Sequence, residues 1–139
     1  MVEAKDLFAH ALKLREAACD DLGYRTVIER AYYSAYHSAV AFEERLPVRS
    51  NAQAQTGSHD LLLQRLERPN TALDYGLKTI SQYIAVQMRM FKGKRELATY
   101  QLDQSIYADD ADTAIKMAKD ILEECALGQK KIAALITKK

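Results

Sequence analysis

The chain has 139 residues and a mass of 15.7 kDa, with 20 Lys and Arg against 19 Asp and Glu. This length suits one domain, residues 1–139, whose core needs neither disulfides nor metal to hold it together. A formal net charge of +1 excludes a protein that coats duplex DNA through a general excess of positive charge. Five Gly and two Pro are few for this length, so we expect an all-α protein.

Location and redox state also follow from composition. The opening residues mix acids and bases with apolar side chains, unlike a signal peptide, and no stretch approaches the length of a membrane span. We therefore expect a cytoplasmic protein without membrane contact. Cys19 and Cys125 lie far apart and form no metal-ligand spacing, so both are expected to be small buried side chains in a reducing compartment. The sequence implies neither a metal nor a cofactor.

Apolar spacing predicts two long helices in the first third of the chain. The first covers about residues 2–18. The second starts where Asp20 or Asp21 can accept hydrogen bonds from free backbone amides. It ends at Leu46, because the residue before Pro47 is pushed out of helical geometry.

The rest of the chain predicts a loop and three more helices. Residues 47–58 are polar and lack apolar periodicity, which indicates a long surface loop. A short helix over residues 59–68 is followed by a longer one, capped by Asn70 or Thr71, that ends near residues 92–94. After an irregular segment, a last helix begins near Asp109 and Asp110. The expected fold is an up-and-down four-helix bundle with an additional short helix.

The second helix carries two different faces. One is a core stripe of apolar residues: Ile28, Tyr32, Ala35, Ala39, Phe42 and Leu46. Arg30 and His37 lie opposite, and their side chains emerge within about 20° of each other, separated by a rise of about 10 Å. Tyr33 and Ser34 lie near them, and no charged residue other than histidine occurs from Ala31 to Phe42. We therefore expect this face to be covered by another protomer or by a neighbouring helix.

An arginine and a histidine on one face can support metal-independent cleavage of RNA. His37 would transfer the proton of the attacking 2′-hydroxyl, and Arg30 would stabilise the extra phosphate charge. A two-fold homodimer would bring two such pairs into a single cleft lined by Tyr33 and Ser34. The alternative interpretation is a snorkelling arginine and a structural histidine.

The residues around this pair resemble a known family. The stretch ERAYYSAYHSAVAFEERL, residues 29–46, closely resembles the signature helix of HEPN domains, in particular small free-standing prokaryotic members. Residues 94–123 also resemble that family's approach to its last helix. The family's motif is an arginine and a histidine separated by four to six residues, and Arg30 and His37 match it. The resemblance implies a helical bundle, homodimers, RNA as the substrate, and a role like that of the toxin in a toxin–antitoxin pair.

Two positions of the family pattern differ here and keep alternatives open. Many active members carry a polar residue after the arginine, where this chain has Ala31. Some carry a tyrosine two residues after the histidine that a partner nucleotidyltransferase modifies, where this chain has Ala39. The alternatives are a non-catalytic HEPN module that binds nucleotide or RNA or partners a nucleotidyltransferase antitoxin, and a structural dimeric adaptor.

A second candidate site is basic. The densest cationic cluster comes at the predicted end of the fourth helix and consists of Arg89, Lys92, Lys94 and Arg95. These residues could hold RNA phosphates, with Tyr100 or Tyr107 available for stacking. Alternatively, they are solvated cations suited to a helix C-terminus. His59, at a helix start, is expected to be a surface or capping residue.

Overall fold

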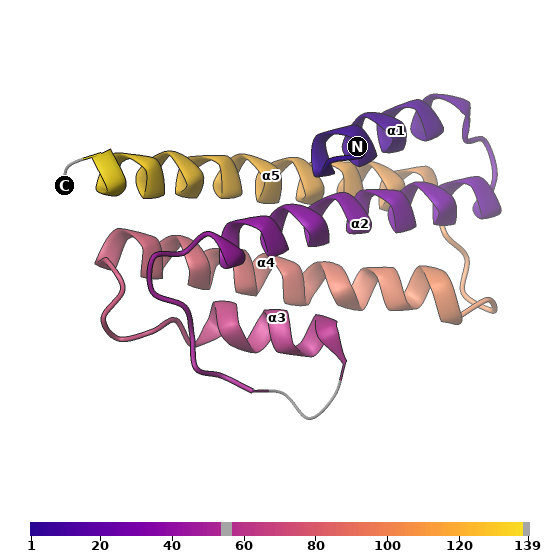
Figure 1. Ribbon diagram of the computed structural model, residues 1–139. Helices are drawn as coiled ribbons and strands as arrows, with labels where there is room; N and C mark the ends of the chain where they lie inside the picture. The colour runs from indigo at the N-terminus through magenta and orange to yellow at the C-terminus, as the bar shows by residue number, and fades with distance from the viewer. Residues whose placement is uncertain (54–56, 138–139) are drawn as a thin grey trace.

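The computed structural model describes residues 1–53 and 57–137, and Figure 1 shows how its helices are arranged. Within these residues the chain forms five helices and no strand, which confirms the predicted all-α bundle. Their bounds are α1 Ala4–Ala17, α2 Asp21–Glu44, α3 Ser58–Glu67, α4 Tyr75–Tyr100 and α5 Ala108–Thr137. In the described part of the chain, no helix has the length and apolar character needed to cross a membrane.

α2 is the central helix. It packs against α1, α3, α4 and α5, while α5 also contacts α1 and α4. The predicted core stripe of α2 is confirmed, because its members are all buried: Ile28, Tyr32, Ala35, Ala39, Phe42 and Leu46. Burial against helices of the same chain therefore explains much of the absence of Lys, Arg, Asp and Glu between Ala31 and Phe42.

The close packing of α2 against α5 depends on a glycine. A Cβ atom at Gly128 would lie 2.3 Å from Cε1 of Phe42, a distance that real Cβ contacts do not reach. Phe42 is fully buried, so its ring has no free space into which to move. Gly128 thus allows the aromatic ring of α2 to pack directly on the backbone of α5.

Acidic side chains begin several of the helices. The Asp20 carboxylate accepts the Gly23 amide at 2.8 Å, as the sequence predicts for the start of α2. The prediction for α4 was wrong, because its N-cap is Asp74, whose carboxylate accepts the Leu77 amide at 3.2 Å, rather than Asn70 or Thr71. Asn70 instead holds the preceding loop, where its side-chain oxygen accepts the Ala72 amide at 2.9 Å.

α4 is also longer than predicted, since it continues beyond residues 92–94 to Tyr100. A buried arginine on α2 stabilises this extension. The Arg25 guanidinium donates to the carbonyl oxygen of Ala98 at 2.8 Å and to that of Gln101 at 3.2 Å. It also bonds the Gln104 carbonyl and pairs with Asp21. The free carbonyls at the end of α4 are therefore satisfied by a side chain from another helix.

The two cysteines differ in their environments. Cys125 is buried on α5 as predicted, whereas Cys19 is exposed in the link between α1 and α2, so the prediction for Cys19 was wrong. Residues 47–53 and 57 are not helical, which agrees with the predicted loop, and residues 54–56 of that loop lie outside the described residues. The loop is anchored where Ser50 donates to the Arg68 carbonyl oxygen at 2.6 Å.

Candidate functional site

Arg30, Tyr33 and His37 lie along the part of α2 that the neighbouring helices leave uncovered. Arg30 and Tyr33 are half-buried and His37 is exposed, whereas Ala31 and Ala35 between them are fully buried. The helical repeat places these three residues one turn apart on the same side of α2. We call this set the α2 stripe.

Aromatic rings fix the position of the His37 imidazole. Tyr33 stacks on it with ring centroids 6.1 Å apart and planes 20° apart. Tyr36 meets it edge-on, with centroids 5.2 Å apart and planes 77° apart. Such ring contacts stabilise the side chain by about 1 kcal/mol each and limit its rotation. The imidazole is thus oriented while remaining accessible to a ligand.

Arg30 and His37 keep their polar atoms available. Among the described residues, neither side chain forms a hydrogen bond or an ion pair within the chain. Other cations of α2 behave differently, since Arg25 is held by three carbonyl oxygens and Arg45 donates to the Gln129 side chain at 3.0 Å. A guanidinium without a protein partner can bind a phosphate through two parallel hydrogen bonds.

Ser34 does not belong to the α2 stripe. It is fully buried, and its hydroxyl donates to the Ala31 carbonyl oxygen at 2.6 Å. The prediction that Ser34 lines a cleft was therefore wrong. A serine in a helix readily satisfies its own hydroxyl in this way, which makes its burial inexpensive.

His59 is a further neighbour of the stripe, and the prediction that it is a surface or capping residue was wrong, because it is half-buried between α2 and α3. It comes from the first turn of α3, yet its Nδ1 shares a hydrogen bond of 2.9 Å with the Tyr32 hydroxyl. Its ring stacks on Tyr36 with centroids 4.1 Å apart. Because Tyr36 also contacts His37, the two histidines flank one tyrosine. No local sequence signal reveals this pairing, which joins residues 27 positions apart.

The surroundings keep His59 neutral. Burial is the main cause that lowers the pKa of His59 below its ordinary value, and the nearby Arg95 and Lys92 lower it further. Burial also strongly raises the pKa of Tyr32, so its hydroxyl stays protonated. The Tyr32–His59 pair is therefore an uncharged element between α2 and α3.

Most of the predicted basic cluster is already paired. Arg89 binds Glu67 at 2.5 Å, and Lys92 binds Asp60 at 3.0 Å. Arg95 pairs with Glu29 at 3.4 Å and lies over the rings of Tyr32 and Tyr100, while Lys94 is exposed. The cluster also lies within α4, so these residues are not cations at a helix end. Carboxylates offset much of the charge that would attract phosphates.

The described residues contain no group of three or more His, Cys, Asp or Glu side chains that could hold a metal ion.

Comparison of the chain with protein-family models, with curated proteins and with solved structures finds no match in any of the three.

Proposed function

We propose that the chain is a metal-independent endoribonuclease of the HEPN type that acts as a homodimer through the α2 stripe. One observation carries the proposal: Arg30 and His37 lie on one open face of α2, and in the described part of the chain no protein group binds their polar atoms. An accessible arginine and an oriented histidine suit a phosphate ligand and a proton transfer.

The reaction is an attack of an RNA 2′-hydroxyl on the adjacent phosphorus. The imidazole of His37 accepts the hydroxyl proton while the bond between O2′ and phosphorus forms. Arg30 stabilises the additional negative charge of the crowded phosphate. The bond between phosphorus and the leaving O5′ then breaks, and a protonated imidazole gives O5′ its proton. The product is a 2′,3′-cyclic phosphate.

The second imidazole is proposed to come from a second copy of the chain. A two-fold axis next to the stripe places two copies of His37 and two of Arg30 in one cleft. One histidine then serves as base and the other as acid. Tyr33, which stacks on His37, offers a ring for an unpaired base of RNA. A toxin-like role with an antitoxin partner belongs to the same proposal.

Cleavage of RNA in a chelator tests the proposal. Wild-type protein is expected to cleave a mixed RNA in EDTA, and His37→Ala is expected to slow cleavage by about a hundredfold or more, because proton transfer contributes on this scale. Arg30→Ala is expected to cause a similar loss through the uncompensated phosphate charge. The rate of fragment formation on a gel is the measurement.

An exposed histidine elsewhere provides the matched control. His10 lies on α1 and is exposed, so His10→Ala is expected to cleave at the wild-type rate. Equal rates for His37→Ala and wild type would remove His37 from the mechanism. Circular dichroism of each variant confirms that α2 remains folded.

A second candidate function is a non-catalytic module that binds RNA or nucleotide, or that partners a nucleotidyltransferase. The observation that favours it is that Ala31, a fully buried residue without a polar side chain, directly follows Arg30. Ala39 is also fully buried and offers no hydroxyl for modification. Binding of RNA by wild type without cleavage, lost in Arg30→Ala, would support this second function.

A further inference from the structure

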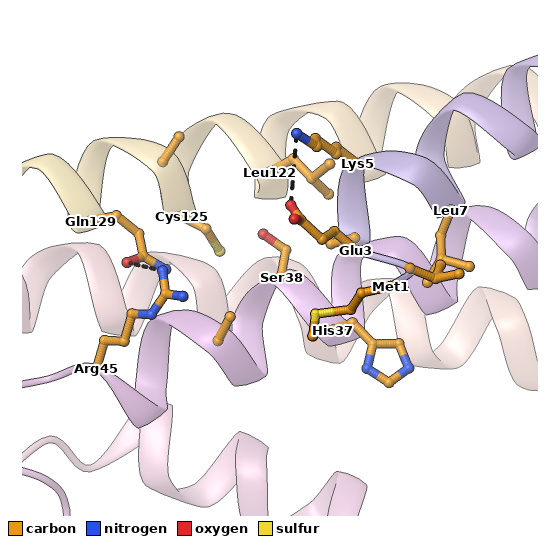
Figure 2. Close-up of a pocket in the computed structure, with 14 residues that line it drawn as sticks. Met1, Glu3, Lys5, Leu7, His37, Ser38, Arg45, Leu122, Cys125 and Gln129 are labelled. Carbon is orange, nitrogen blue, oxygen red and sulfur yellow. Dashed lines mark hydrogen bonds and ion pairs between the residues drawn. The ribbon is translucent and has the colours of Figure 1, made fainter.

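A groove of about 760 Å³ opens between α2 and α5 directly beside the α2 stripe. His37 lies at one edge of this groove, and Arg45, which follows α2, and Gln129 of α5 form a hydrogen-bonded pair toward its other end (Figure 2). Residues 1–5 form another part of the wall. The volume falls within the range of roughly 300–1,000 Å³ that is typical of sites for small organic groups. We call it the α2–α5 groove.

Small side chains line the space between the two helices. Ser38 and Ala41 from α2 face Cys125 and Ala126 from α5. In Figure 2 the Ser38 and Cys125 side chains point into the space between the helices. Burial raises the pKa of the Cys125 thiol to about 12, so this surface is uncharged at neutral pH. A flat aromatic ligand can therefore approach both helix backbones closely.

Polar groups stand around this small-residue surface. Arg45 and Gln129 present guanidinium and amide donors and an amide carbonyl acceptor, which match the edge of a nucleobase. The Glu3 carboxylate also lines the groove, and Lys5 offsets its charge at 3.7 Å. An aromatic ring with a polar edge therefore fits the small-residue surface, with Arg45 and Gln129 placed to bind that edge.

We propose that the α2–α5 groove binds the base of the nucleotide next to the scissile phosphate of single-stranded RNA. This inference rests on the proposed function, because it takes the phosphate to lie at Arg30 and His37. From His37, one helical turn of about 5.4 Å along α2 leads to Ala41 in the groove. That step is short enough for a neighbouring nucleotide to reach, provided its base is unpaired and splayed out of the strand.

The test uses a substitution that fills the groove, and it measures the binding of RNA separately from its cleavage. The probe is a short fluorescent single-stranded RNA whose 2′-hydroxyls are methylated, so that it cannot be cleaved. Ala126 is an exposed residue of the groove lining, and Ala126→Leu adds three carbons there without disturbing the core. We expect Ala126→Leu to weaken binding at least about tenfold in fluorescence anisotropy, together with a smaller loss for Gln129→Ala.

The matched control is on the same helix. Ala133 is exposed two turns farther along α5 and does not line the groove, so Ala133→Leu is expected to bind within about twofold of wild type. The same RNA annealed into a duplex is expected to bind wild type more weakly than the single strand.

The outcomes separate this inference from the proposed function. Wild-type affinity in Ala126→Leu overturns the inference, even if uncleavable RNA binds and natural RNA is cleaved. Loss of binding in Ala126→Leu but not in Ala133→Leu supports it, even if natural RNA is bound without being cleaved. Absence of binding to wild type overturns the inference, and cleavage of natural RNA in EDTA then decides the proposed function independently.

Discussion

At the residue scale, two arginines of α2 look alike in sequence and have different roles. Arg25 is 7% exposed and binds backbone oxygens of residues 98, 101 and 104, whereas Arg30, five positions later, has no polar partner among the described residues. The oxygens that bind Arg25 come from more than 70 residues away. Sequence alone could therefore single out Arg30 by its spacing to His37 but could not recognise Arg25 as structural.

His59 should make stability depend on pH. Its pKa is lower in the folded chain than the ordinary value, so the unfolded chain binds more protons between those two pKa values. The contribution of His59 to the free energy of unfolding is therefore complete above the pKa of about 6.5 that the residue has in the unfolded chain. It declines as the pH falls toward the lower pKa that His59 has in the folded chain. We expect urea titrations to show lower stability at pH 5 than at pH 7.

Replacement of the titrating ring tests this assignment. His59→Gln is expected to reduce the difference in stability between pH 5 and pH 7, whatever its effect at neutral pH. His10→Gln, at an exposed position on α1, is expected to leave that difference as it is in wild type. An unchanged difference in His59→Gln would assign the pH dependence to other groups.

At the scale of elements, apolar spacing predicted all five helices and the core stripe of α2. It placed the end of α4 too early, because Gly93 and the basic residues around it are typical of a helix end. Gly93 has open space around it, so it does not interrupt α4. The carbonyls near Ala98 and Gln101 are satisfied by Arg25, a tertiary contact that local patterns cannot reveal. Ser34 was misplaced for a related reason, since the burial of that side of α2 depends on neighbouring helices.

Replacement by alanine should change the stability of the fold in opposite directions at two glycines. Gly128→Ala is expected to destabilise the fold by about 1–3 kcal/mol, because the new Cβ collides with the buried Phe42 ring. Gly93→Ala is expected to stabilise it by about 0.5–1 kcal/mol, because nothing lies within 4 Å and alanine favours the helix. Thermal or urea unfolding of both variants measures these changes. A neutral Gly128→Ala would mean that α2 and α5 are farther apart than described.

At the scale of the whole molecule, the seven-residue spacing of Arg30 and His37 predicted that both lie on one face of α2. It did not reveal that His59 and Tyr36 adjoin that face, since α3 brings His59 from a distant part of the chain. α1, α3, α4 and α5 pack on α2, but in the described part of the chain they leave His37 exposed and Arg30 and Tyr33 half-buried, so the predicted cover of this face is incomplete. The proposed dimer therefore rests on the open α2 stripe alone, and its role in catalysis can be tested directly.

Subunit mixing is the most direct test of a shared Arg30 and His37 site. Wild-type and His37→Ala chains, carrying different affinity tags, are co-expressed, and mixed dimers are purified through both tags. The His37→Ala dimer alone is expected to cleave RNA in EDTA at background level. The mixed dimer retains one His37, so the shared cleft lacks either its base or its acid, and its rate is expected to fall to about a tenth of the wild-type rate or less. A mixed dimer that keeps about half of the wild-type rate, as two independent sites would, would contradict a site completed by two copies of α2.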